Sequence, residues 1–298
     1  MTHHQKVTVI CAVLFVVLFS GSMVSRRHLE ATGSGHAALD EVLYLPSGKT
    51  IKKLSLGYSG LLADIYWTRA VQYFGAQHIG GAAHYELLAP LLDITTDLDP
   101  NLTVAYDTGS IFLSQRPPEG AGQPDKAAAF VEKGIRANPS NWRLYFTLGF
   151  IHYTDRHDPK AAELAFQKGS EVPGALPWMK ALAARMAEHA DDPATAASMW
   201  QTIHDTTKDS GLKTTAEKHL LSLRVEAELN ELERRTKAYF DRHNAYPEEW
   251  SDLIRDGLLR GVPVDPNGAP YKLRLDGTVQ VQNPKDFPFL ERHKSPAK

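Results

Sequence analysis

Apolar residues recur at the spacing of an α-helix along most of this chain, from about residue 49 to residue 243. The pattern is clearest over residues 213–243, where the apolar stripe steps by three or four residues: Leu221, Val225, Leu229, Leu232, Thr236 and Tyr239. Such steps keep the side chains on one face, so they predict one long helix here. The alternation typical of a strand is found at residues 279–282, near the C-terminus. The pattern therefore predicts a mainly α fold.

A charge-free apolar segment lies near the N-terminus, from Val7 to Val24. As a helix, its 18 residues would measure roughly 27 Å, enough to span the apolar core of a bilayer. We therefore expect a membrane anchor over residues 1–27. The alternative is a cleaved signal peptide with its cleavage site at Ser20-Gly21-Ser22. The arginine pair at residues 26–27, directly after the apolar segment, favours the uncleaved anchor.

Sequence features recur with a period of 34 residues in the middle of the chain. Asp158-Pro159 recurs as Asp192-Pro193, and Pro139 recurs as Pro173. At the same offset, small and aromatic residues match in type: Ala162 with Ala196, Phe166 with Trp200, and Gly149 with Ala183. A repeat of this length is typical of stacked pairs of helices.

This segment resembles the tetratricopeptide repeat (TPR) family. Residues 138–149 are similar to the first helix of a repeat, and Leu148-Gly149 supplies the small residue that lets two helices approach closely. Residues 158–169 (DPKAAELAFQKG) are similar to the second helix. The resemblance implies a TPR-like α-solenoid of helical hairpins over residues 55–212, with less regular units at its ends.

In the TPR family, the first helices of the repeats line a groove that binds protein partners. Carried onto the matching positions of this sequence, the groove residues are Tyr106, Ser110, Arg143, Phe146, Phe150, Tyr153, Lys180 and Ala184. Aromatic side chains together with Arg and Lys would suit an extended peptide, including an acidic one. The alternative is that Phe146 and Phe150 pack between helices, because aromatic residues at helical spacing often belong to a core.

The last part of the chain, residues 213–298, has a different order of elements. The long helix is followed by a short helix from Pro247 to Ile254, by the motif DPNGAPY at residues 265–271, and by a hairpin that turns at residues 275–278. This order resembles the globular part of the major pseudopilins of type II secretion, which implies a small α+β module and an exported body. Helical repeats occupy the position of that family's membrane-embedded helix, so polymerisation is not carried over. Calcium binding is not carried over either, because only Asp265, Asn267 and Asp276 could contribute ligands.

Composition and charge exclude several classes of function. The 298 residues include 33 Lys+Arg and 35 Asp+Glu, which gives a net charge of −2. A dedicated nucleic-acid binder would show a basic excess. The single cysteine, Cys11, excludes an intrachain disulfide framework and a Cys-rich metal site.

The sequence also lacks the common catalytic motifs. His152, Asp155, His157 and Asp158 crowd one loop, where loop polarity explains them more simply than a bound metal does. No HExxH, no GxSxG and no phosphate-binding glycine loop occurs. We therefore expect no catalytic residue, no metal, no cofactor and no small-molecule substrate.

The charges beside the apolar segment do not decide which side of the membrane holds the body of the protein, that is, the residues after the anchor. Arg26 and Arg27, set against Lys6, favour a cytoplasmic body. The short polar head before one apolar span and the pseudopilin-like end of the chain favour export. We expect a single-pass protein of the inner membrane with a periplasmic body.

Together these features predict a membrane-anchored TPR scaffold that mediates protein–protein interaction in a bacterial envelope complex. Two alternatives stay open: a permanent accessory subunit of a larger membrane complex, for secretion, pilus assembly or energy transduction, and an enzyme with an unrecognised site. The predicted domain order is an anchor (1–27), a linker with a short extended segment (28–54), TPR-like repeats (55–212) and a long helix with a small α+β module (213–298).

Overall fold

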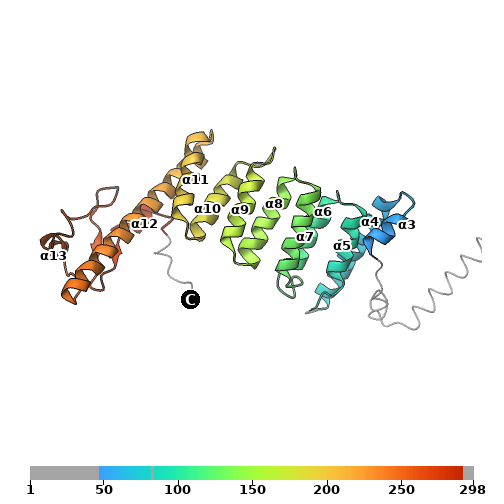
Figure 1. Ribbon diagram of the computed structural model, residues 1–298, viewed down its shortest axis with the longest axis horizontal. Helices are drawn as coiled ribbons and strands as arrows, with labels where there is room; N and C mark the ends of the chain where they lie inside the picture. The colour runs from blue at the N-terminus through green and yellow to red at the C-terminus, as the bar shows by residue number, and fades with distance from the viewer. Residues whose placement is uncertain (1–46, 82–83, 291–298) are drawn as a thin grey trace, which may run out of the picture. The chain divides into compact units, whose positions relative to one another are not determined.

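The computed structural model describes residues 47–81 and 84–290 (Figure 1). The predicted membrane anchor and most of the predicted linker lie outside the described residues. The residues up to Asp99 form one compact unit, and those from Pro100 onward form another. The division therefore falls inside the predicted repeat region and not at residue 212.

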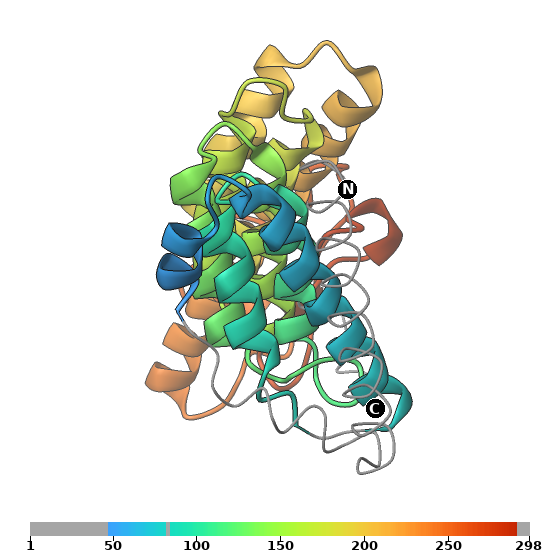
Figure 2. The same cartoon turned by 90° about the vertical axis from the view of Figure 1, so that its right-hand side faces the viewer.

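The first unit consists of three helices, α3 (Gly48–Leu54), α4 (Ser59–Ile79) and α5 (Leu88–Leu98). Both α3 and α4 pack against α5 (Figure 2). Helix α3 lies in the predicted linker region, residues 28–54, where the helical spacing of the sequence begins. It forms because the Ser47 hydroxyl accepts a hydrogen bond from the backbone N–H of Thr50, and because Gly48 allows close contact with Asp97 of α5.

The second unit begins with a series of consecutive helices. They are α6 (Thr103–Ser114), α7 (Pro124–Ala137), α8 (Trp142–Phe150), the π-helix η2 (Ile151–Asp155), α9 (Pro159–Ser170), α10 (Trp178–His189), α11 (Pro193–Thr206) and α12 (Ser210–His243). Each α-helix packs against the next one in the chain, and in Figure 1 they lie side by side. The expectation of a mainly α protein built from consecutive packed helices is confirmed.

The recurring Asp-Pro pairs begin equivalent helices. Asp158 and Asp192 are the N-caps of α9 and α11, and the following prolines are the first helical residues. The two carboxylates accept hydrogen bonds from the backbone N–H groups three residues later, at 2.9 Å in α9 and 3.1 Å in α11. Asp satisfies a free N–H of the first turn, and Pro has no N–H to lose there. The 34-residue period therefore marks repeated helix starts.

Glycines lie where neighbouring helices approach most closely. A Cβ atom added to Gly149 of α8 would lie 2.5 Å from Cε1 of the buried Phe166 of α9. A Cβ on Gly134 of α7 would lie 2.6 Å from Cγ of Tyr106 of α6. The predicted close approach at Gly149 is confirmed, and it occurs against an aromatic ring.

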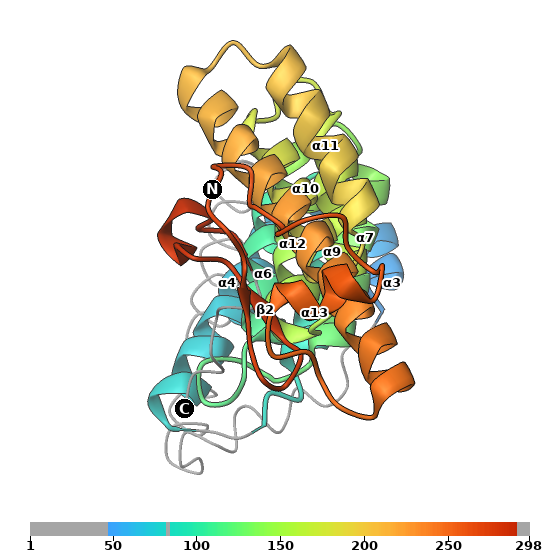
Figure 3. The same ribbon diagram turned by 90° about the vertical axis from the view of Figure 1, so that its left-hand side faces the viewer.

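The C-terminal half of α12 supports a small module. Helix α13 (Trp250–Arg255) and the strands β1 (Lys272–Leu273) and β2 (Val279–Gln280) lie close to it, as Figure 3 shows. The strands pair antiparallel, with Leu273 opposite Val279, so the predicted hairpin is confirmed. Two hydrogen bonds position Tyr271 at the centre: its hydroxyl donates to Glu228 at 2.8 Å, and its carbonyl accepts from the Trp250 indole at 2.9 Å.

The N-terminal half of α12 belongs to the helical series. Ala216 shares a buried cluster with Ala184 of α10 and with Trp200 and Ile203 of α11. Helix α12 is therefore part of two cores. The predicted boundary at residues 212–213 lies just after the start of this helix.

A buried histidine joins the end of the chain to the helical series. The His219 ring is stacked between Trp200, at 4.0 Å between ring centroids, and Phe289, at 3.6 Å. One oxygen of Glu188 accepts hydrogen bonds from both the Trp200 indole, at 2.7 Å, and His219 Nδ1, at 2.8 Å. The segment after η3 (Pro284–Asp286) thus packs against α12 through Phe289, and the Arg185 guanidinium of α10 lies over the same ring at 5.8 Å.

We predict that Gly149→Ala destabilises the second unit. The new methyl group would overlap the Phe166 ring inside a packed contact, which costs about 1–3 kcal/mol of unfolding free energy. Urea denaturation followed by circular dichroism measures the change. The control is Gly75→Ala in α4, where a Cβ atom meets nothing within 4 Å and helix propensity should add about 0.5–1 kcal/mol. Equal midpoints for Gly149→Ala and wild type would contradict the close contact.

Candidate functional site

An apolar groove lies beside α6, α8 and η2. We call it the α6–α8 groove; it encloses about 410 Å³ and is lined by Ile111, Ser114, Gln115, Phe146, Thr147, Phe150, Ile151, Thr154 and Asp155. Its elements belong to the second unit alone. Most of its exposed lining is apolar, with polar residues interspersed, which is the character of a recognition site.

Aromatic rings that support one another form part of this lining. Phe150 is 42% exposed, yet its ring lies 4.7 Å from that of Phe146 and 5.9 Å from that of the buried Phe166. The steep angles between these rings, 61° and 84°, are the edge-to-face geometry that aromatic pairs prefer. The row continues onto α10, where the Trp178 ring lies 5.3 Å from Phe146. The exposed rings are therefore held in place before any partner binds.

The π-helix η2 shapes one end of the groove. The backbone N–H of Arg156 donates to the carbonyl of Ile151, five residues earlier, at 3.0 Å. This wider turn places Thr154 and Asp155 beside the apolar residues at the end of α8. Short π-helical turns are frequent at functional sites.

A buried histidine within η2 stabilises this helix. The side chain of His152 is 6% exposed, and its Nδ1 lies 3.0 Å from Nη1 of Arg156. Because a guanidinium can only donate, Nδ1 must accept, which requires the neutral ring. Burial, followed by the nearby Arg156 charge, lowers the pKa of His152 below its ordinary value. Arg156 in turn donates to Asp125 of α7 at 2.9 Å, so this chain of contacts ties η2 to α7.

The electrostatic character of the groove is acidic. Of the described residues that line it, Asp155 carries a charge, and the others are apolar or neutral. A second carboxylate, Asp107 of α6, accepts a hydrogen bond from the hydroxyl of the lining residue Thr147. Such a groove favours a partner with apolar side chains and a positive charge.

The structure separates the eight residues predicted for the binding groove. Phe146 and Phe150 line the α6–α8 groove, and Tyr153 lies on η2 with its ring 5.6 Å from that of His189. Arg143 is exposed, and its guanidinium lies over the Trp142 ring at 4.8 Å. Lys180 lines a different hollow, between α9, α10 and α11. Arg143 and Lys180 are therefore not part of the lining of the α6–α8 groove.

Three of the predicted residues are buried, which corrects their expected exposure. Tyr106 packs against Gly134 and the Phe130 ring, Ser110 donates to the carbonyl of Asp107 within its own helix, and Ala184 belongs to a core cluster. Each is fully buried, so a partner would not reach its side chain.

Sequence reasoning missed other lining residues. Ile111 is a large apolar residue, exposed on α6 one residue beyond the predicted Ser110. Asp155 was assigned to a polar loop, whereas the π-helix holds it at the groove. The signal for Ile111 was an apolar residue at a position of the helical period where a polar residue is expected. No sequence signal marks the π-helix.

Comparison with known protein families finds no family that matches the chain, and no curated protein sequence matches it. Within residues 47–81 and 84–290, no helix combines the length and apolar character needed to cross a membrane. In the same part of the chain, no three His, Cys, Asp or Glu side chains lie together as a metal site would require.

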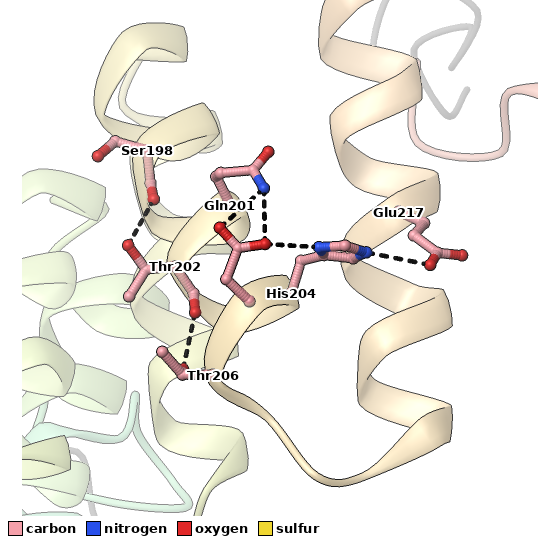
Figure 4. Close-up of polar contacts among 7 residues, drawn as sticks. Ser198, Gln201, Thr202, His204, Thr206 and Glu217 are labelled. Atoms are coloured by element: carbon pink, nitrogen blue, oxygen red, sulfur yellow. Dashed lines mark hydrogen bonds and ion pairs between the residues drawn. The ribbon is translucent and has the colours of Figure 1, made fainter.

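One further polar cluster joins α11 to α12 (Figure 4). His204 Nδ1 lies 2.9 Å from Asp205, and Nε2 lies 3.1 Å from Glu217. The hydrogen bonds from His204 and Gln201 lower the pKa of the Asp205 carboxyl. Because Thr202 and Thr206 donate only to backbone carbonyls of their own helix, they add no group to the cluster. These hydrogen bonds link the two helices and do not surround a pocket.

We predict that His152 makes the stability of the second unit pH-dependent. Its pKa is lower in the folded protein than in the unfolded chain, so the unfolded chain takes up the proton first as the pH falls. Stability is then present above about pH 6.5 and lost progressively below it.

The test compares wild type with His152→Gln, which can still accept from Arg156 but does not titrate. Urea denaturation between about pH 7.5 and pH 5.5 should show a smaller loss of unfolding free energy for the variant than for wild type. Parallel losses in the two proteins would contradict the prediction.

Proposed function

We propose that this protein is a scaffold that binds a protein partner in the α6–α8 groove. The observation that supports the proposal most is the row of partly exposed aromatic rings, Phe146, Phe150 and Trp178, held by edge-to-face contacts on consecutive helix pairs. Rigid aromatic side chains supply contact area at a small cost in conformational entropy. A groove assembled from helices also has the form in which many proteins bind an amphipathic segment.

We further propose that the helical series is a TPR-like solenoid. Its support is the 34-residue recurrence of capped helix starts together with small residues at the helix contacts. The chain would be anchored in the inner membrane by Val7–Val24, with a periplasmic body, as part of a bacterial envelope complex. The support for this location is the charge-free segment and the pseudopilin-like order of the C-terminal elements.

The chemistry of the groove selects the class of partner. Apolar side chains of the partner would contact Ile111, Phe146 and Phe150, and a Lys or Arg at the edge would pair with Asp155. An acidic segment would instead bring its charges next to this carboxylate and would be repelled. The partner segment is therefore amphipathic and basic.

We predict that a photo-reactive amino acid at position 150 forms a discrete adduct with one protein in cells that natively produce the chain. The matched control is position 164: Leu164 of α9 is exposed to a similar degree, 46% against 42% for Phe150, but does not line the groove. The adducts are separated by gel electrophoresis and identified by mass spectrometry. Equal adducts at both positions, or none at position 150, would refute the groove as the binding surface.

Asp155→Lys should then weaken the position-150 adduct about tenfold, because it replaces attraction with repulsion at the edge of the groove. Asp155→Asn should have a smaller effect in the same direction. Changing the facing Lys or Arg of the partner to Glu should restore binding to Asp155→Lys. An adduct that is insensitive to both Asp155 variants would contradict a basic partner.

A further inference from the structure

Exposed apolar side chains gather at the corner between α3 and α4. Leu54, Leu56, Tyr58 and Leu61 lie within eight residues of one another, and each is more than half exposed, with Leu56 the most exposed at 88%. Single exposed leucines are ordinary on protein surfaces, but such a sequence of large apolar side chains is not. We call these four residues the α3–α4 corner.

The backbone holds this corner in place. The Ser55 hydroxyl donates to the carbonyl of Lys52 at 2.7 Å, and the N–H of Tyr58 donates to the carbonyl of Ser55 at 2.8 Å. Leu56 has φ 49°, in the left-handed region that leucine rarely adopts. Its outward position is therefore part of an ordered turn.

Positive charge lies on the helix next to these apolar side chains. Lys49, Lys52 and Lys53 of α3 are all exposed, and no Asp or Glu occurs between residues 42 and 63. Asp97 of α5 packs beside Gly48, and Lys52 Nζ donates to the Asp97 carbonyl at 3.3 Å, so the net charge of the corner stays positive. Basic residues next to leucines and a tyrosine are the composition of segments that lie in the interface of an anionic bilayer. In such segments, lysines contact lipid phosphates, and apolar side chains enter the boundary of the acyl chains.

We propose that the α3–α4 corner binds the surface of an anionic membrane. The proposal concerns a different surface from the α6–α8 groove and does not depend on a partner binding there. Charge complementarity selects the bilayer over a protein partner, because the three exposed lysines outnumber the Asp97 carboxylate beside α3, and the apolar side chains next to them project into solvent. Its place in the chain agrees: Ser47 follows the predicted anchor (residues 1–27) by 20 residues, which even when fully extended reach no farther than about 70 Å.

The test uses the full chain in lipid vesicles. In a Cys11→Ser background, a nitroxide label is placed at Leu56→Cys, and its accessibility to oxygen and to a water-soluble nickel chelate is measured by electron paramagnetic resonance. The matched control is Leu275→Cys, because Leu275 is similarly exposed, at 79%, and lies in the hairpin turn of the second unit.

In vesicles of phosphatidylcholine with added phosphatidylglycerol, the label at position 56 should be shielded from the nickel chelate and open to oxygen, and the label at position 275 should show the reverse. Replacing Lys49, Lys52 and Lys53 by Gln should restore chelate access at position 56, since each lysine contributes about a fivefold gain in partitioning.

Chelate access at position 56 that matches position 275 in anionic vesicles would overturn the proposal. Shielding that is equally strong in pure phosphatidylcholine or in detergent would also overturn it. In that case, dipolar broadening between labels would identify a second copy of the chain as the occupant.

Discussion

Contact between a glycine on one helix and a large side chain on the next sets the spacing of the second unit. Gly134 lies against Tyr106, Gly149 against Phe166, and Gly169 against both Tyr145 and Met179. At each of these positions a Cβ atom would lie within 2.7 Å of its neighbour, so any other residue would push the helices apart. The Phe166 ring fills the space that Gly149 leaves. Phe150, the residue after Gly149, packs edge-to-face beside the same ring and remains partly exposed.

Helix α12 connects the packed helices to the C-terminal module. Its first half completes the cluster around Trp200, and its second half forms the core of the C-terminal module. Between these two clusters, Glu188 forms a buried polar contact with His219, and burying these groups costs free energy. The cost is offset because the Glu188 oxygen accepts from two donors and the His219 ring is enclosed by Trp200 and Phe289. A buried pair with these requirements favours one alignment of the three helices over others.

The sequence predicted those features that depend on local chemistry. The Asp-Pro starts of α9 and α11 are local signals, and so are the turn of the hairpin and the apolar stripe of α12. The exposure of single residues depends instead on which neighbour covers them. Phe150 and Ala184 are equivalent at an offset of 34 residues, yet Ala184 is buried because α11 and α12 cover it, whereas Phe150 borders a groove. The π-helix η2 shifts the phase of the residues that follow Phe150, and its hydrogen-bond pattern has no counterpart in the apolar periodicity.

The two exposed apolar surfaces differ in a way that suits different occupants. In the α6–α8 groove, aromatic rings are fixed by their neighbours and stand next to a carboxylate, so their shape is defined before contact. A fixed shape is useful when the partner also has a fixed shape, as a folded protein segment does. At the α3–α4 corner, three leucines and a tyrosine project from an ordered turn next to exposed lysines. A bilayer interface is fluid and adapts to the side chains that enter it, so it places no demand on shape, only on apolar area and charge.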